Sequence, residues 1–318
     1  MALIRDDLEQ VEAQFKKDLD SQVSLIRKVG EYVLSSGGKR VRPMLLLLSA
    51  RLAGYQGSAH VSLAGVIEFI HTATLLHDDV VDSAVLRRGN ESANSVWGNQ
   101  ASVLVGDFLL GRSFSVMVEN GDLDVLRVVS EASTQMAEGE MLQLIGSCDI
   151  DMDETRYLDV IRNKTAALIA AACRCGAILG RLDAAHEEAL SMFGMDLGIA
   201  FQMMDDALDY VADEEDFGKT RGHDLAEGKM TLPLIHTLQN CSSAERERVE
   251  EIIERGELSP EELAEVCALI ASYRGIDYTR QRAREQIDSA KGRLAPFDNN
   301  VAKDALFCLA DYVVERTR

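Results

Sequence analysis

The sequence has 318 residues but only four prolines, and aromatic residues make up 5% of it. Because proline interrupts a helix interior, this scarcity favours long uninterrupted helices. The apolar run Met44–Ala50 is far shorter than the roughly 20 residues that a membrane-spanning helix needs, and no apolar run in the sequence approaches that length. The first residues contain no apolar signal region. We therefore expect an all-α protein with no transmembrane segment and no secretion signal.

Positive charge is also scarce, with 33 Lys and Arg against 53 Asp and Glu and a net charge of −20. Binding to a polyanion needs a basic face, so this balance argues against nucleic acid as a partner. The six cysteines form no disulfide or zinc-binding pattern. We therefore expect a reducing, cytoplasmic location.

The spacing of the apolar residues is mostly three and four, which is the period of a helix. With no strand-rich block and no repeat, it predicts one all-α helical bundle domain over residues 1–318. The segments Ser35–Arg40, Arg87–Ser92 and Asp213–Lys229 are predicted as loops, and the length of the last suggests a functional lid. The predicted helices cover 2–18, 21–35, 43–54, 59–82, 93–97, 101–119, 122–145, 154–180, 184–212, 230–239, 243–255, 260–272, 274–293 and 299–316.

Three carboxylates, Asp78, Asp79 and Asp82, form a D-D-x-x-D pattern near the end of a long apolar helix. Residues four apart share a helix face, so Asp78 and Asp82 point the same way. Paired carboxylates suit Mg²⁺, which keeps several waters and bridges to substrate phosphates. Taken alone, this pattern is equally well explained by a solvated acidic helix end.

The same pattern recurs at Asp205, Asp206 and Asp209, again after an apolar helical run. Two such copies, each at the end of an apolar helix, are hard to explain as solvated acidic helix ends. If the two helices face each other, six carboxylates converge, and they need several divalent ions to neutralise them. Those ions in turn indicate a polyanionic ligand.

Basic residues accompany both aspartate motifs. Gly37 and Gly38 let the backbone approach an anion closely, and lysine and arginine can bind phosphate oxygens. His71 lies almost two turns before Asp78 and shares its face, which fits either a phosphate donor or a core histidine equally well. Together the cations predict two diphosphate sites, one bridged by metal and one purely basic. These cations are Lys39, Arg40, Arg42, Arg87, Arg88, Lys164, Lys219 and Lys229.

From about residue 20 onward, the sequence resembles the trans-isoprenyl diphosphate synthase family, and most closely its long-chain members, which form octaprenyl-like products. The resemblance rests on "GGKRVRP", "HDDVVDSAVLRRG", "GDFLL", "EGEMLQL", "KTAAL" and "FQMMDDALDYVADEEDFGKTRGHDLAEGKMTLPL". It implies the isoprenoid synthase fold, a helical bundle around a large central cavity, in a homodimer that uses three Mg²⁺ ions, for which Mn²⁺ can substitute. One departure is His223, where members often have an acidic residue.

The resemblance also implies a role for each matching residue. Asp78, Asp82 and Asp205 are the main metal ligands, supported by Asp79, Asp206 and Asp209. The allylic diphosphate is held by Arg87, Lys164, Thr165, Gln202, Lys219 and Lys229. Isopentenyl diphosphate is held by Lys39, Arg42, His71 and Arg88. The implied activity is a Mg²⁺-dependent prenyltransferase that joins isopentenyl diphosphate to an allylic primer and can deliver its long-chain product to a membrane.

Two small residues, Ala73 and Thr74, lie about one turn before the first motif. In the family, bulky residues at these positions block elongation, so small ones indicate a long product and an open channel. Close helix packing is the alternative explanation. We expect Ala73→Phe or Ala73→Tyr to shorten the product.

Four other functions fit part of the sequence. A medium-chain farnesyl or geranylgeranyl diphosphate synthase differs only in product length. A class I terpene cyclase leaves the basic "GGKRVRP" segment and Arg88 unexplained. A non-catalytic regulatory subunit is disfavoured because both aspartate motifs are intact. The E-x-x-H pattern of Glu68 and His71 fits a di-iron bundle, but the chain has no second copy of it.

Overall fold

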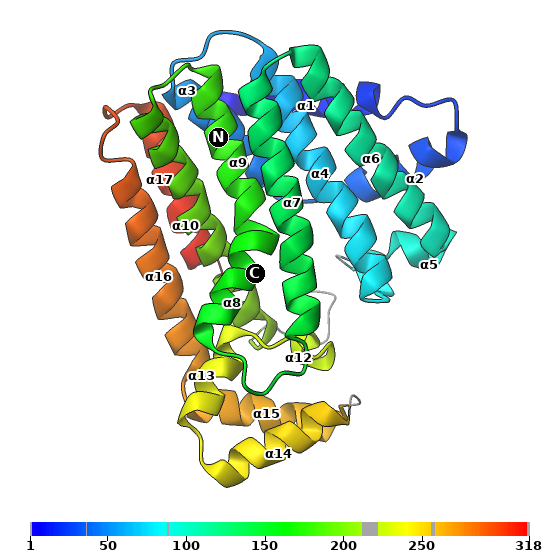
Figure 1. The fold of residues 1–318 in the computed structure, drawn as a ribbon, viewed down its shortest axis with the longest axis vertical. Helices are drawn as coiled ribbons and strands as arrows, with labels where there is room; N and C mark the ends of the chain where they lie inside the picture. Colours follow the sequence, from blue (N-terminus) through cyan, green and yellow to red (C-terminus); the bar gives the residue numbers. More distant parts are fainter. Residues whose placement is uncertain (1, 36, 88, 212–221, 256–257, 317–318) are drawn as a thin grey trace. The chain divides into compact units, whose positions relative to one another are not determined.

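The computed structural model describes residues 2–35, 37–87, 89–211, 222–255 and 258–316 (Figure 1). Nearly all secondary structure in these ranges is helical, which confirms the predicted all-α class. The only strands among them are β1 (Leu86–Arg87) and β2 (Asn90–Glu91), which pair as an antiparallel hairpin. The chain divides into two compact units. The boundaries fall within α7 (Leu123–Ile145), α9 (Ala167–Leu179), α10 (Ala184–Asp209), α16 (Gly275–Arg293) and α17 (Val301–Glu315). A single domain over 1–318 stays a prediction.

Unit 1 comprises residues 1–133, 168–194 and 292–309. Its helices include most or all of η1 (Ala2–Ile4), α1 (Arg5–Asp18), α2 (Ser24–Ser35), α3 (Val41–Leu52), α4 (Ala59–Val81), α5 (Ala93–Trp97), α6 (Asn99–Asn120) and α9 (Ala167–Leu179). It also takes in parts of α7 (Leu123–Ile145), α10 (Ala184–Asp209) and α17 (Val301–Glu315).

The core of unit 1 is built around α3 and α4. The α3 helix is buried almost all round, and Leu45, Leu46 and Leu47 have no accessible surface, as expected for a helix that is apolar on every face. Gly176 on α9 allows close packing, because a Cβ there would lie 2.5 Å from the Ser49 side chain. Against this core, α4 packs along α6, α3 and α1, which makes it a central helix of unit 1.

Within the described ranges, two helices, α4 and α6, are long and apolar enough to cross a membrane. The most apolar window of α4 is 72% buried inside the protein and that of α6 is 39% buried. A core helix of a folded protein has the same length and composition, so these windows are weak evidence for a span. The absence of a transmembrane segment stays a prediction.

Unit 2 comprises residues 134–167, 195–291 and 310–318. Its complete helices are α8 (Glu154–Ile161), the π-helix η2 (Arg162–Ala166), α12 (His223–Ala226), α13 (Leu232–Asn240), α14 (Ser243–Glu254) and α15 (Pro260–Ser272), followed by nearly all of α16 (Gly275–Arg293).

Local sequence signals explain where several unit 2 helices begin. Ser242 and Ser259 each form a capping box with the glutamate three residues later, which satisfies the first free backbone N–H groups. Pro260 follows Ser259 at the first helical position, as predicted. Asp153 caps α8 by accepting a hydrogen bond from the backbone N–H of Arg156 at 2.9 Å.

The observed helices match the predicted ones closely, with three differences. The helix predicted over 154–180 is interrupted by η2 at 162–166. The short helix α12 lies inside the segment Asp213–Lys229, which was predicted to be a loop. The predicted loop Arg87–Ser92 contains part of the β1–β2 hairpin.

Candidate active site

The first aspartate motif occupies the last turn of α4 in unit 1. His71, Thr74, Asp78 and Asp82 follow one another at intervals of three and four, and all four are half-buried. They therefore lie on one face of the helix. The predicted alignment of His71 with Asp78 is consistent with this pattern.

The middle aspartate, Asp79, lies on a different face and is only 3% exposed. The Nε atom of Arg87, on β1, donates a hydrogen bond to its carboxylate. The side chain of Asn94 donates to the Asp79 backbone carbonyl at 3.1 Å. Asp79 thus ties the hairpin to α4, and the guanidinium of Arg87 is anchored beside the motif rather than free to swing.

The two predicted chain-length positions differ in exposure. Ala73 has no accessible surface, whereas Thr74 is half-buried on the face of Asp78. Of the two, only Thr74 therefore has surface open to a bound chain. His77, next to the motif, places its Nε2 atom 3.2 Å from the Val103 carbonyl on α6.

The basic segment "GGKRVRP" precedes and begins α3. Arg40 has a left-handed backbone with φ of 49°, which is uncommon for a residue other than glycine. Its guanidinium donates to Glu68, to Glu12 at 3.0 Å and to the Leu34 carbonyl at 2.9 Å. Arg40 therefore anchors the segment, while Lys39 is exposed and Arg42 is half-buried.

Glu68, the partner of Arg40, bears on the di-iron alternative. Glu68 is 5% exposed and its carboxylate is paired with the Arg40 guanidinium. Burial lowers the pKa of Arg40, but Glu68 and Glu12 raise it, and the net shift is upward. A carboxylate engaged in this way is a poor iron ligand, so the structure disfavours the di-iron interpretation.

In unit 2, Lys164 and Thr165 lie on the π-helix η2, a distortion that is often found at functional sites. Gly139 on α7 makes room for it, since a Cβ at Gly139 would lie 2.3 Å from the Lys164 backbone nitrogen. Next to Gly139, the Glu140 carboxylate forms an ion pair with the Lys164 ammonium. Glu140 thus fixes the position of the lysine.

The second aspartate motif begins with a hydrogen-bond chain that runs from η2 to α10. Thr165 donates to Gln202 at 2.8 Å, and Gln202 donates to Asp206 at 2.8 Å. The Tyr157 hydroxyl of α8 donates to the other Asp206 oxygen at 2.6 Å. Burial raises the pKa of Asp206 well above its usual value, and Asp224 adds to this shift.

The outer aspartates have different surroundings. The side chain of Asp205 is 42% exposed. Asp209 accepts a hydrogen bond from the Asp224 backbone N–H at 3.1 Å, which brings a further carboxylate to the motif. Within both motifs the middle aspartate is buried and held by protein donors, and the outer carboxylates are more exposed.

Lys229 lies nearby in the chain segment that follows α12. Its ammonium is 2.7 Å from Glu227, which also lies 3.2 Å from His223. Burial raises the pKa of Glu227, but His223 and Lys229 outweigh it and bring the pKa to about 2. His223, the one departure from the family pattern noted in the sequence, thus pairs with a carboxylate.

A pocket of about 130 Å³ in unit 2 brings together some of the predicted residues of this half, but its lining does not include Asp205 or Asp209. Its lining includes the two ends of the hydrogen-bond chain and Lys229, together with apolar side chains such as Met152 and Val160. The predicted site residues in the lining are Lys164, Thr165, Gln202, Asp206 and Lys229.

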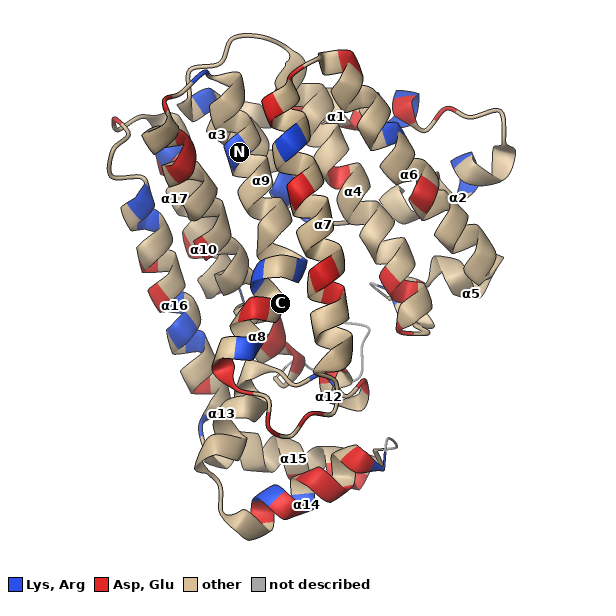
Figure 2. Ribbon diagram, viewed as in Figure 1, with Lys and Arg blue, Asp and Glu red and all other residues tan. Residues whose placement is uncertain are grey.

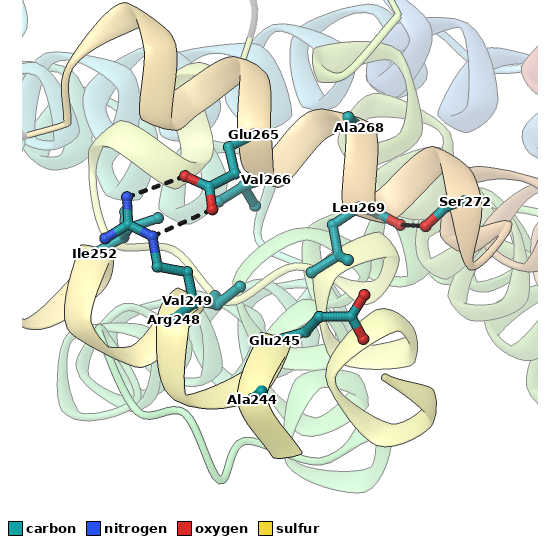
Figure 3. A pocket seen from close by; sticks show the side chains of 10 residues that line it. All are labelled: Ala244, Glu245, Arg248, Val249, Ile252, Glu265, Val266, Ala268, Leu269 and Ser272. Atoms are coloured by element: carbon teal, nitrogen blue, oxygen red, sulfur yellow. Dashed lines mark hydrogen bonds and ion pairs between the residues drawn. The ribbon is translucent and has the colours of Figure 1, made fainter. Parts of the chain in front are cut away.

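A second pocket in unit 2, of about 450 Å³, lies between α14 and α15 (Figure 3). The Arg248 guanidinium binds both oxygens of Glu265 at its edge, at 3.2 and 3.0 Å. Along α14, acidic residues predominate and arginines lie among them (Figure 2). This pocket contains none of the predicted site residues, so we do not assign it to the active site.

Two predicted ligands, Arg88 and Lys219, lie outside the described residues. Among the residues that are described, no three His, Cys, Asp or Glu side chains are placed to hold a metal ion by themselves. Each motif instead offers oxygen donors in small number, which fits a divalent ion that completes its shell with water and phosphate oxygens. Convergence of the two motifs stays a prediction.

Sequence reasoning missed several residues that shape these sites. Tyr157 carries no motif signal, because a tyrosine in an amphipathic helix is usually a core residue. Glu140 and Gly139 belong to a recognised segment, but only the fold shows that they contact η2. Arg316, which follows α17, forms an ion pair with Asp205 at 2.7 Å from a position 111 residues away.

The matches to known proteins agree with this arrangement. Residues 23–270 match the family model described as polyprenyl synthetase. The chain is 45% identical to octaprenyl diphosphate synthase from Escherichia coli (strain K12), covering 99% of this chain and 98% of that protein. Polyprenyl synthase from Caulobacter crescentus CB15, solved with calcium and isoprenyl diphosphate, is 42% identical with a TM-score of 0.97, covering 100% of this chain and 97% of that one.

A decaprenyl diphosphate synthase from Rhodobacter capsulatus is similarly close, with 42% identity and a TM-score of 0.95, covering 100% of this chain and 98% of that one. Helical fold, paired aspartate motifs and basic segments define a prenyl-transferring class of enzyme. The chain belongs to the polyprenyl synthetase family.

Proposed function

We propose that the protein is a prenyltransferase that elongates an allylic diphosphate head-to-tail (1′–4) with isopentenyl diphosphate, giving a long-chain, all-trans, octaprenyl-like diphosphate. The observation that carries this proposal is the common design of the two aspartate motifs. In each motif the middle carboxylate is buried and bound by protein donors, while the outer ones are more exposed. Similarity over 99% of the chain to an octaprenyl diphosphate synthase supports the long product.

Three Mg²⁺ ions are the proposed cofactors, and Mn²⁺ can replace them. Asp78, Asp82 and Asp205 would be the main ligands, with Asp209 beside them and Asp79 and Asp206 supporting from behind. When bound, the ions neutralise the diphosphate oxygens and favour their departure from carbon. The calcium present in the related Caulobacter enzyme supports the use of divalent ions.

The allylic diphosphate would be bound by Thr165 and Gln202 together with four cations. These cations are Arg87, Lys164, Lys219 and Lys229. Glu140 holds Lys164 in place, and Asp79 holds Arg87. Preorganised cations stabilise the charge that develops on the leaving group, which is usually the largest contribution to catalysis. The C–O bond of the allylic substrate then breaks and leaves an allylic carbocation.

Isopentenyl diphosphate would bind Lys39, Arg42, His71 and Arg88. Arg40 fixes the segment that carries Lys39 and Arg42, and Glu68 fixes Arg40. The isopentenyl double bond attacks the carbocation and forms the new C–C bond. Loss of a proton to the released diphosphate restores a double bond, so the product is again an allylic diphosphate. Water must be excluded, because it would trap the carbocation.

Product length would depend on the space below the first motif. Thr74 has accessible surface on the face of Asp78, and Ala73 lies next to it in the packed core. Small side chains at both positions leave room for a long chain.

The protein would act as a homodimer in the cytoplasm and deliver its product to a membrane. One face of α6 supports self-association, since Leu104, Phe114 and Val118 are large apolar residues that are 65%, 42% and 65% exposed. Their spacing of ten and four places them on one side of the helix.

Purified protein with Mg²⁺, radiolabelled isopentenyl diphosphate and a short allylic primer provides the test. We expect label in the organic extract, its loss when a chelator removes the metal, and its loss in Asp78→Asn and Asp205→Asn. A folded protein that yields no extractable product would overturn the assignment. A product that lacks the diphosphate would instead indicate a cyclase.

A further inference from the structure

Arg316 is a buried arginine that the proposed mechanism does not use. Its side chain is 4% exposed. Its Nη2 atom donates to the Phe201 carbonyl at 2.8 Å, its Nε atom donates to the Val313 carbonyl at 3.2 Å, and its guanidinium lies over the Phe201 ring at 4.2 Å. These contacts hold the charged group in one place beside α10.

The fixed guanidinium lies 2.7 Å from Asp205 Oδ1. Asp205 is the first carboxylate of the second motif, and its side chain is 42% exposed. Arg316 thus binds a carboxylate that also has surface open to a ligand, which makes the ion pair part of the motif rather than part of the core.

A positive charge in this position affects how strongly the second motif binds a divalent ion. Asp206 interacts with both Asp205 and Asp224, and the Asp224 backbone N–H donates to Asp209, so several carboxylates lie near one another at the end of α10 and the start of α12. Without a cation they repel one another, and Arg316 relieves part of that repulsion. A divalent ion bound to Asp205 would lie within a few ångströms of the guanidinium and be repelled by it.

We propose that Arg316 is a built-in counter-ion of Asp205, which weakens divalent-ion binding at the second motif until a diphosphate is present. A diphosphate carries more negative charge than the ion that accompanies it, so Arg316 attracts the ion–diphosphate pair although it repels the ion alone. The motif therefore favours ions that arrive with substrate. This inference rests on the proposed function for its biological meaning, but the ion pair and its effect on metal binding do not.

The test is the affinity of the full-length protein for Mn²⁺, followed by electron paramagnetic resonance of the free ion without substrate. We expect Arg316→Met to bind Mn²⁺ roughly tenfold more tightly or better. Arg316→Lys keeps the charge and should bind like the unmodified protein. Arg112→Met is a matched control, because Arg112 pairs with buried Asp18 at 2.7 Å in unit 1, and it should leave Mn²⁺ affinity unchanged.

Two further arms isolate the ion pair. In an Asp205→Asn background, Arg316→Met should give no gain in Mn²⁺ affinity. With saturating inorganic diphosphate, the gain from Arg316→Met should fall to less than about twofold or reverse. Arg316→Gln serves in place of the methionine variant if thermal melting shows that the latter does not fold.

Unchanged or weaker Mn²⁺ binding in the neutral folded variant would overturn the proposal, as would a gain that persists in the Asp205→Asn background or with diphosphate. Tighter Mn²⁺ binding in a protein that forms no prenyl product would support the counter-ion and refute the synthase assignment. The two failures are therefore distinguishable.

Discussion

Because Gly139 contacts η2 closely, we expect Gly139→Ala to force η2 away from α7. A Cβ at this position would lie 2.3 Å from the Lys164 nitrogen and 2.8 Å from both the Asn163 carbonyl carbon and the Lys164 Cα. All three are backbone atoms, so no rotamer change can relieve the overlap. Helix α7 and η2 must separate by about 1 Å, since ordinary carbon contacts are about 3.5–4 Å.

The expected cost follows from two opposing effects. Overpacking of a well-packed contact costs about 1–3 kcal/mol. Alanine in a helix interior is about 1 kcal/mol more favourable than glycine and offsets part of this. We therefore expect a net loss of about 1 kcal/mol in the free energy of unfolding, which lowers Tm by about 1–2 °C in a chain of 318 residues. Because Lys164 and Thr165 move with η2, kcat/KM for the allylic substrate should fall by up to about 100-fold.

Thermal melting and initial rates at varied primer concentration measure both effects. Gly292→Ala is the matched control, because a Cβ on this helical glycine meets no atom within 4 Å. It should keep or slightly raise Tm and leave kinetics unchanged. A Gly139→Ala protein that melts like the control and binds the primer normally would refute the reasoning.

Other residues give predictions of the same kind. Tyr157→Phe removes a donor from buried Asp206 and should cost about 1–3 kcal/mol in chemical denaturation, with a raised KM for the primer; an unchanged midpoint would contradict the role of that bond. Thr74→Phe should shorten the product with little effect on Tm, whereas Ala73→Phe should also destabilise by about 1–3 kcal/mol because Ala73 is fully buried; unchanged product length in both would argue against this channel. Glu227 has a folded pKa of about 2 against the ordinary 4.5, so its ionised form stabilises the fold above pH 4.5 and this contribution is lost as the pH falls toward 2. The Tm difference between the unmodified protein and Glu227→Gln should therefore be full at neutral pH and shrink below about pH 4.5, and a difference that is independent of pH would exclude the depressed pKa.

Much of the fold follows directly from the sequence, because apolar spacing and capping residues are local signals. The helix predicted over 260–272 begins at Pro260 in the structure, and Ser259, Pro260 and Glu262 each act on that first turn. The π-helix at 162–166 could not be predicted in this way. It depends on Gly139, which contacts it from another helix.

In the candidate site, too, the features set by local sequence could be predicted, and those set by contacts between distant residues could not. Motif spacing identified the aspartates and placed Asp78 and Asp82 on one face, because helix periodicity fixes that relation. It could not distinguish Asp79 and Asp206 as buried anchors, since their burial depends on Arg87 and Tyr157. The pair of Arg316 and Asp205 also lies beyond local reasoning, because its members meet only after α17 returns to α10.

The mass of the product made from isopentenyl diphosphate and a short allylic primer tests the central claim most directly. Reverse-phase separation with mass spectrometry should show allylic diphosphates that differ by one isoprene unit and end in a long-chain species. The account predicts that this series disappears in Asp78→Asn and Asp205→Asn. A series that stops at farnesyl or geranylgeranyl diphosphate would contradict the long-chain assignment, and the absence of any elongated diphosphate from folded protein would contradict the account as a whole.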